Sequence, residues 1–178
     1  AETGAALHLA ALAALAAAAA TGVELAPLLP ALSRFGGVKR RLERLGEVGG
    51  VVVYDDFAHH PTAIRTTLQG LRARASGRVI VAMEPRSNSM RLGAHADALA
   101  PSLDEADAVV FLHRPELAWD AAAVVSALRG EGLAVPDVGT LVAKLVGIVR
   151  PGDQVVFMSN GGFEGAQRRF LEALGRGD

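Results

Sequence analysis

Strand-like and helix-like segments alternate through most of this 178-residue chain, and that alternation constrains its fold more than any other feature. Apolar runs expected to form strands lie at 51–54, 78–83, 108–112, 133–136 and 154–158. Segments with helical spacing of apolar residues lie between and after them, at 61–74, 90–103 (in part), 119–130, 139–149 and 163–174. The strands are rich in Val and Ile and lack polar alternation, as expected when both faces of a sheet are covered. The pattern predicts an α/β fold with a doubly wound, mostly parallel sheet and helices on both faces.

An alanine-rich helix is expected at the start of the chain, over residues 4–20. Alanine is the strongest helix former, and Leu7, Leu12 and Leu15 are spaced to help line one face against a neighbour. The stretch resembles a membrane span in length, but alanine contributes little transfer energy and His8 interrupts it. A signal peptide would need a basic leader, which is absent. We therefore expect a packed helix here.

A second helical piece and a hairpin are expected to connect this helix to the α/β unit. Residues 21–35 indicate a turn and a short helix, and residues 40–57 a β-hairpin that turns near Gly49 and Gly50. The break between the two parts is expected near 36–38. The chain begins with Ala-Glu instead of Met, which indicates that it was processed or cut from something longer. The expected division is into residues 1–37 and 38–178.

Composition excludes several classes of function. The formal net charge is -1, which provides no general attraction to nucleic acid or to an anionic membrane. The chain contains 0 cysteines, so disulfides and thiolate metal sites are excluded. A cysteine-free chain fits a cytoplasmic protein.

Polar loops follow three of the expected strands. They read DDFAHHP after 51–54, EPRSNSMR after 78–83 and SNGGFEG after 154–158. In open α/β sheets, ligands bind beyond the carboxyl ends of the strands, and parallel strands bring those ends to one edge. The sequence therefore predicts that the three loops form a site together.

The first loop also allows structural interpretations. Asp56 could simply cap the helix that Pro61 begins, since side-chain oxygens commonly take that role. His59 and His60 could be zinc ligands, but adjacent histidines rarely converge on one ion and no further ligand spacing is evident. A histidine near a turn is also often just hydrogen-bonded. We expect no metal site in this chain.

The second loop favours a functional reading. Glu84, Arg86, Asn88 and Ser89 follow directly after a buried strand. Arg86 could be an ordinary surface cation, but an arginine fork among polar side chains suits a carboxylate or a phosphate. We predict a loop that recognises such an anion.

The third loop is close to a dinucleotide fingerprint. Residues 160–165 read NGGFEG, where G-x-G-x-x-G would need Gly at 160. Too little chain follows to supply the ribose-binding acid, so close backbone approach to an anionic or polar ligand is the better interpretation. No G-x-x-x-x-G-K-[ST] occurs in the chain, so it carries no P-loop for a nucleoside triphosphate.

Together, the three loops resemble one family. VYDDFAHHPTAI at 53–64, EPRSNSMRLG at 84–93 and MSNGGFEG at 158–165 are similar to the C-terminal domain of the Mur ligases. Within that family the motifs resemble the murein peptide ligases of cell-wall recycling more than the ligases that add L-alanine. The resemblance implies a Rossmann-like C-terminal domain over 38–178. It also implies that 1–37 is a helical remnant of the central ATPase domain and of the hinge.

The resemblance implies an ATP-dependent ligase as the intact protein. Such an enzyme joins L-Ala-γ-D-Glu-meso-diaminopimelate to UDP-N-acetylmuramate through an acyl phosphate. ATP and Mg²⁺ would be held mainly by the central domain, as would much of the UDP-sugar. This chain alone would fold but not catalyse, since it lacks the P-loop.

The resemblance also implies site residues. Arg41, Asp56 and His59 would contact the nucleotide, with Arg41 approaching the phosphates and Asp56 the ribose. The incoming tripeptide carries several carboxylates, which suit an arginine fork. The residues that would face the tripeptide are His60, Arg86, Asn88, Ser89, Asn160 and Gly161.

Two other classes of function stay open at this point. A free-standing nucleotide-binding or dehydrogenase-like domain would bind a dinucleotide tightly by itself. A non-catalytic interaction module would tolerate replacement of Asp56, Arg86 and Asn160 without loss of activity in the full-length protein.

Overall fold

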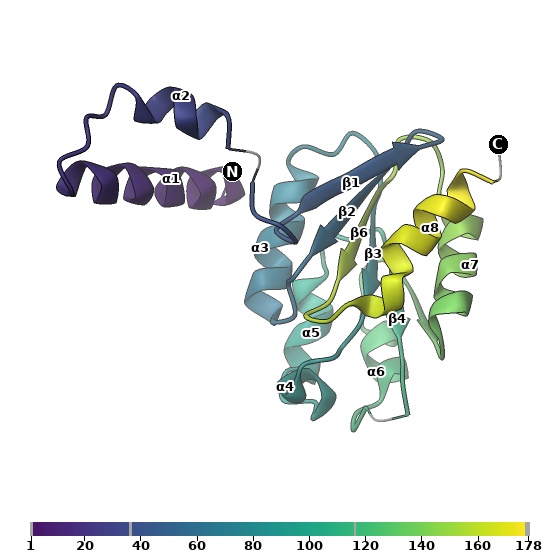
Figure 1. The fold of residues 1–178 in the computed structure, drawn as a ribbon. Helices are drawn as coiled ribbons and strands as arrows, with labels where there is room; N and C mark the ends of the chain where they lie inside the picture. Colours follow the sequence, from purple (N-terminus) through teal and green to yellow (C-terminus); the bar gives the residue numbers. More distant parts are fainter. Residues whose placement is uncertain (1, 36, 116, 177–178) are drawn as a thin grey trace.

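A computed structural model describes residues 2–35, 37–115 and 117–176 of the chain (Figure 1). Two helices come first and are followed by an α/β unit. The helices are α1 (Glu2–Ala20), α2 (Leu28–Ser33), α3 (Pro61–Arg72), α4 (Asn88–Arg91), α5 (Ala96–Ser102), α6 (Ala121–Ser126), α7 (Val138–Ile148) and α8 (Ala166–Leu174), with a 3₁₀ turn, η1 (Phe163–Gly165), before α8. The strands are β1 (Glu43–Val48), β2 (Val51–Asp56), β3 (Val79–Met83), β4 (Ala108–Leu112), β5 (Glu131–Val135) and β6 (Gln154–Met158).

The strands form one sheet of six in the order β1-β2-β6-β3-β4-β5. β1 is antiparallel to β2, and every other neighbouring pair is parallel. Gly49 and Gly50 turn the β1–β2 hairpin with φ values of 56° and 74°, a left-handed turn that glycine adopts without strain. The predicted fold class and the predicted hairpin are both confirmed.

Helices cover both faces of the sheet, each over its own apolar core (Figure 1). On one face, α7 and α8 pack on side chains such as Phe157 and Phe170. On the other face, α3, α4, α5 and α6 pack on side chains such as Val81 and Phe111. β3 and β4 are buried along their whole length, which explains why their sequences show no polar alternation.

Several element bounds differ from the expectations. β2 continues to Asp56, so both aspartates belong to the strand and not to the loop after it. The helix expected over 119–130 is only α6, and the strand expected at 133–136 begins earlier, at Glu131. The helical segment expected within 90–103 is two helices, α4 and α5. The exact ends of these helices and strands depend on hydrogen bonds in the folded protein, which the spacing of apolar residues along the sequence does not show.

Helix α1 forms as expected, but its exposed surface differs from the expectation. Leu12 is 60% exposed and Leu15 is half-buried, while the side chains of Leu7 and His8 lie outside the described residues. The high intrinsic propensity of alanine accounts for this helix without deep burial. Gly36, within the expected break, also lies outside the described residues. No helix in the described part of the chain is long and apolar enough to cross a membrane.

Candidate functional site

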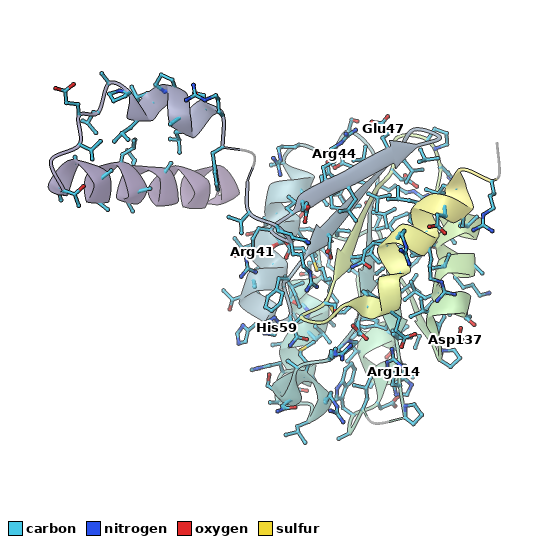
Figure 2. The ribbon with its side chains drawn as sticks, viewed as in Figure 1. Arg41, Arg44, Glu47, His59, Arg114 and Asp137 are labelled. Atoms are coloured by element: carbon cyan, nitrogen blue, oxygen red, sulfur yellow. The ribbon has the colours of Figure 1, made fainter. Side chains whose placement is uncertain are left out.

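The three polar loops lie side by side at one edge of the sheet. β6 lies between β2 and β3, and Met158 at its end is in register with both Asp56 and Met83. The loops that leave these residues therefore start from neighbouring points, as the sequence predicts. Figure 2 shows Arg41, His59 and Arg114 toward this end of the molecule, while Glu47, in register with Val52, lies toward the other end of the sheet.

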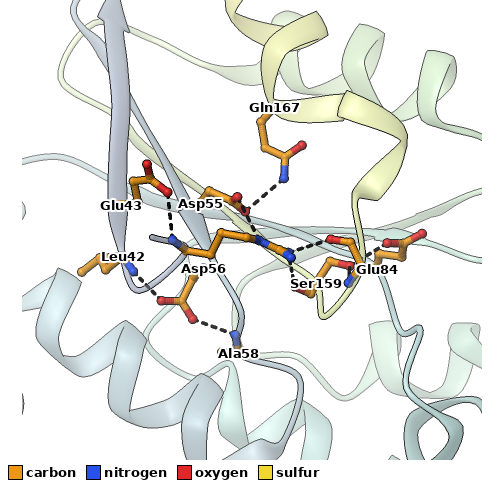
Figure 3. Close-up of polar contacts among 10 residues, drawn as sticks. Leu42, Glu43, Asp55, Asp56, Ala58, Glu84, Ser159 and Gln167 are labelled. Atoms are coloured by element: carbon orange, nitrogen blue, oxygen red, sulfur yellow. Dashed lines mark hydrogen bonds and ion pairs between the residues drawn. The ribbon is translucent and has the colours of Figure 1, made fainter. Parts of the chain in front are cut away.

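Asp56 is almost fully buried, at 3% exposure, and its carboxylate holds neighbouring backbone in place. One oxygen accepts the N–H of Leu42 at 2.6 Å, and the other accepts the N–H of Ala58 at 2.7 Å (Figure 3). Burial raises the pKa of this carboxyl above its ordinary value, against the lowering effect of those hydrogen bonds. The interpretation of Asp56 as a helix cap is wrong. His60 caps α3 instead, accepting the Thr62 N–H, and Pro61 begins the helix as predicted.

Asp55, the preceding residue, faces a different partner. Its carboxylate accepts from Nε of Arg40 at 3.2 Å and from Nε2 of Gln167 at 3.0 Å. The same Arg40 donates to the carbonyl oxygens of Ser159 and Gly161 (Figure 3). Both aspartates therefore bind the segment that precedes β1. Asp55 binds the side chain of Arg40, and Asp56 binds the backbone N–H of Leu42.

A cationic and aromatic group lies beside the first loop. The guanidinium carbon of Arg41 is 5.1 Å from the centre of the Phe57 ring, and that of Arg40 is 5.2 Å away. His59 meets the same ring edge-on at 5.3 Å, and its Nδ1 lies 2.9 Å from the Phe57 carbonyl oxygen. The Arg41 side chain is exposed, so its charge is available to a ligand. Arg41, Asp56 and His59 thus lie within one small region.

His60 is placed differently from His59. Its exposed ring caps α3 and packs edge-on against His95, with the ring centres 4.5 Å apart. No group of three or more His, Cys, Asp or Glu side chains among the described residues could hold a metal ion.

Glu84 is the buried centre of the second loop, at 3% exposure. One of its oxygens accepts the Ser159 hydroxyl at 2.6 Å, and the other lies 3.4 Å from an Nη2 donor of Arg114. Arg86 is more distant, at 3.9 Å, and 57% exposed. A buried carboxylate thus holds two arginines at the site.

A cavity of about 300 Å³ opens beside this carboxylate. It is lined by Glu84, Pro85, Arg86, Arg91, Leu112, Arg114, Leu117 and Glu164. Among the described residues that line it, three arginines face two glutamates, so positive charge is in excess among them. Arg114 also pairs with Glu164, and this contact, followed by that with Glu84, raises the pKa of the guanidinium. Arg91 forms no ion pair with any described residue and remains available to an anion.

The structure brings together some of the predicted acceptor-side residues and separates others. Arg86 lines the cavity, whereas Asn88 and Ser89 begin α4 and do not line it. Ser89 instead lies 3.3 Å from the hydroxyl of Ser87, the residue that caps α4. Asn160 has a buried side-chain oxygen without a hydrogen-bond partner.

Gly161 supports Arg86 through close backbone contact. A Cβ atom at this position would lie 2.4 Å from Cδ of Arg86, so a side chain here would force Arg86 to move. The Gly161 N–H donates to the Ser159 hydroxyl at 2.9 Å. The backbone of this loop thus lies close to a side chain of the site, while its close approach to an anionic or polar ligand stays a prediction.

Sequence reasoning missed the three charged residues Arg91, Arg114 and Glu164, which line the cavity. Arg91 and Glu164 belong to two of the quoted polar loops, so their position there was the available signal. Arg114 follows β4, a fourth strand that ends at the same edge, but no motif surrounds it. Its signal was only that a charged residue follows a buried strand.

Comparisons with known proteins agree with this arrangement. Residues 40–161 match the family model described as "Mur ligase, glutamate ligase domain". The UDP-N-acetylmuramate–L-alanyl-γ-D-glutamyl-meso-2,6-diaminoheptandioate ligase of Escherichia coli K12 is 46% identical over 82% of this chain. The UDP-N-acetylmuramate–L-alanine ligase of Nocardioides sp. is 43% identical over 76% of this chain. The chain spans 32% of the length of each of these two relatives.

Solved structures show the same fold. The crystal structure of a murein peptide ligase from Psychrobacter arcticus superposes with a TM-score of 0.71 at 41% identity. The match covers 93% of this chain and 36% of that one. The sheet and the arrangement of its loops are therefore shared with a much longer protein.

Proposed function

Because this chain belongs to the Mur ligase family, we propose that it is the acceptor-binding domain of an ATP-dependent ligase that joins a murein tripeptide to UDP-N-acetylmuramate. Members of this family are ATP-dependent ligases that form amide bonds. The proposed acceptor is L-Ala-γ-D-Glu-meso-diaminopimelate, the peptide named in the Escherichia coli relative. The place of action would be the cytoplasm, and the pathway peptidoglycan recycling.

The observation that carries the proposal is the arginine-lined cavity at the carboxyl edge of the sheet. Arg86, Arg91 and Arg114 line it, and of the lining residues that the structure describes, Glu84 and Glu164 offset part of their charge. The tripeptide bears several carboxylates, and the planar guanidinium fork matches a carboxylate in geometry and charge. A ligand carboxylate could bind Arg91 without displacing an existing ion pair.

In the proposed reaction the γ-phosphoryl group of ATP passes to the lactyl carboxylate of the muramoyl sugar, giving an acyl phosphate and ADP. The amine of the acceptor, having lost a proton, attacks the acyl carbon. The tetrahedral intermediate then collapses, the C–O bond to phosphate breaks, and the amide remains. This chain's contribution would be to hold the acceptor so that its amine reaches that carbon.

The nucleotide side would be formed by Arg41, Asp56 and His59. Arg41 has an exposed charge for phosphate, and His59 stands beside it against Phe57. Asp56 already accepts two backbone N–H groups, so it would mainly hold this segment, and only its remaining lone pairs could accept a ribose hydroxyl. Asn160, with its unpartnered oxygen, and Gly161 would complete the acceptor side, with His60, Asn88 and Ser89 at its margin.

The proposal extends to the division of the chain. Residues 1–37 would belong to the central ATPase domain and hinge, and 38–178 to the acceptor domain. Closure of the two domains would bring the loop of Asp56 to the nucleotide. The chain alone would bind the acceptor but form no amide, since its sequence carries no P-loop.

Calorimetric titration of this chain tests the proposal. The ligands are the tripeptide, L-alanine and NAD. The variants are Arg86→Ala and a control, Arg44→Ala, whose exposed side chain pairs with Glu47 on the edge strand β1 and does not line the cavity. Binding of the tripeptide that weakens only in Arg86→Ala supports the proposal. Preference for L-alanine would indicate the L-alanine ligase instead, and tight NAD binding would indicate a free-standing dinucleotide domain.

The same replacements in the full-length protein test the reading as a non-catalytic module. Loss of ligase activity in Arg86→Ala or Asn160→Ala, with Arg44→Ala unchanged, would exclude that reading. Full activity in all three would overturn the assignment of the site.

A further inference from the structure

Arg40 connects parts of the chain that are far apart in sequence, and none of the sequence motifs singles it out. Its guanidinium donates to the Ser159 carbonyl at 2.5 Å, to the Gly161 carbonyl at 2.7 Å and to Asp55 at 3.2 Å. The side chain is only 24% exposed. It therefore reaches from the segment before β1 to the loop after β6, where Figure 3 labels Ser159.

The backbone around Arg40 adopts an unfavourable conformation that its neighbours hold in place. Arg40 has φ 57° and Leu42 has φ 49°, both in the left-handed region that residues with side chains avoid. The Arg40 N–H donates to Glu43 at 2.8 Å, and the Leu42 N–H donates to Asp56 at 2.6 Å. Such conformations persist only where several contacts determine them, so segment 40–42 is held in a defined shape.

The far end of the same connection reaches the acceptor cavity. Arg40 binds the Gly161 carbonyl, and the backbone of Gly161 lies against Arg86. Arg40 also binds the Ser159 carbonyl, while the Ser159 hydroxyl donates to Glu84. Both loop residues that Arg40 holds therefore contact side chains that line the cavity.

Arg41, the residue next to Arg40, has an exposed side chain whose guanidinium carbon lies 5.1 Å from the centre of the Phe57 ring. A movement of segment 40–42 would shift Arg41 and, through Arg40, the loop of Gly161. The side chain of Arg40 thereby connects Arg41, on the proposed nucleotide side, with Arg86, on the proposed acceptor side.

We propose that Arg40 is a positioning residue that locks segment 40–42 to loop 159–161, so that the nucleotide side and the acceptor side of the domain move as one unit. The part that concerns ligands rests on the proposed function. The locking itself does not, because it depends only on contacts within the chain. The two parts can therefore be tested separately.

The experiment compares the full chain with Arg40→Ala and with the control Arg44→Ala. Amide hydrogen exchange is followed at Gly161, whose N–H is bonded to Ser159, and at the buried strands β3 and β4. We expect exchange at Gly161 to rise about tenfold in Arg40→Ala while β3 and β4 keep their protection. The tripeptide should bind about tenfold more weakly in this variant, and Arg44→Ala should match the wild type on every measure.

Chemical rescue of Arg40→Ala distinguishes a positioning role of Arg40 from a general contribution to the stability of the fold. Methylguanidinium added at millimolar concentration should partly restore both Gly161 protection and tripeptide affinity in Arg40→Ala, because it can occupy the space of the lost guanidinium. It should produce no gain in Gly161 protection in Arg86→Ala, where Arg40 still holds the loop. Unchanged exchange at Gly161, or an equal loss of protection throughout the sheet, would overturn the proposal.

Two further results are informative. If Arg40→Ala does not fold, Arg40→Lys replaces it, and an intermediate rise in exchange confined to the loop is expected, since one ammonium cannot bind both carbonyls and Asp55 equally well. Unchanged Gly161 protection in Arg40→Lys would count against the lock. If the wild-type chain does not bind the tripeptide, the proposed function of the isolated domain fails, while exchange and rescue still decide the role of Arg40.

Discussion

The backbone of Gly161 lies so close to the side chain of Arg86 that a Cβ on the glycine would approach Cδ of the arginine to 2.4 Å. The two residues come from the loops after β6 and β3, which are neighbouring parallel strands. In the proposed acceptor site, this contact would let the glycine influence binding through Arg86. The role of this loop can therefore be tested by replacing Gly161, without removing a charged side chain.

Gly161→Ala should displace Arg86 and weaken tripeptide binding by about tenfold or more, as expected when a bidentate carboxylate contact is lost. Gly162→Ala is the matched control, because nothing lies within 4 Å of its added Cβ and its φ is -79°. Titration of both variants, with thermal unfolding in parallel, checks the prediction. Equal affinity in the two variants would show that Arg86 does not need its present position.

Arg114→Ala should also weaken tripeptide binding, by about tenfold, because it removes a cavity-lining cation and leaves Glu84 with less positive charge nearby. Arg114→Lys should recover part of the loss, since a lysine keeps the charge without the fork. Arg129→Ala serves as the control, because Arg129 is exposed and 4.0 Å from its partner Asp104. Wild-type affinity in Arg114→Ala would remove this residue from the site.

Ser159→Ala should destabilise the fold by about 1–3 kcal/mol, because it removes a buried hydroxyl that donates to Glu84 and accepts from Gly161. The free energy of unfolding in urea measures this effect. Ser126→Ala removes an exposed hydroxyl bonded to the Ala123 carbonyl and should change stability little. A Ser159→Ala protein as stable as Ser126→Ala would mean that Glu84 is satisfied in another way.

The raised pKa of Asp56 predicts a definite sign for its effect on stability. Between the ordinary value of 3.8 and the higher folded value, the folded state binds more protons than the unfolded state. Stability therefore falls as pH rises above 3.8 through this window. Measured by urea unfolding, the wild type should lose stability relative to Asp56→Asn as pH increases.

Asp137→Asn provides a control of opposite sign. The backbone N–H of Thr140 lowers the pKa of Asp137 below 3.8, so this group contributes stability that is lost as pH falls through its folded value. The wild type should gain stability relative to Asp137→Asn as pH rises toward 3.8. A gain relative to Asp56→Asn over the higher window would contradict the predicted direction at Asp56.

Local sequence was a good guide wherever one residue and its near neighbours decide the structure. Pro61 begins α3, and Gly49 and Gly50 turn the hairpin, because their backbone preferences are intrinsic. It was a poor guide to caps that compete. Asp56 and His60 both precede α3, but the Asp56 carboxylate binds the N–H groups of Leu42 and Ala58, and His60 caps the helix.

The sequence by itself determined the doubly wound sheet and the edge at which its three polar loops meet. Periodicity and burial on both faces are properties of neighbouring residues, and the parallel connection then places the strand ends together. Only the tertiary structure decided that Arg40 binds Ser159 and Gly161, 119 and 121 residues away, and that Arg114 completes the cavity. Such contacts depend on where several strands and loops meet in space, and no local pattern of residues encodes that meeting point.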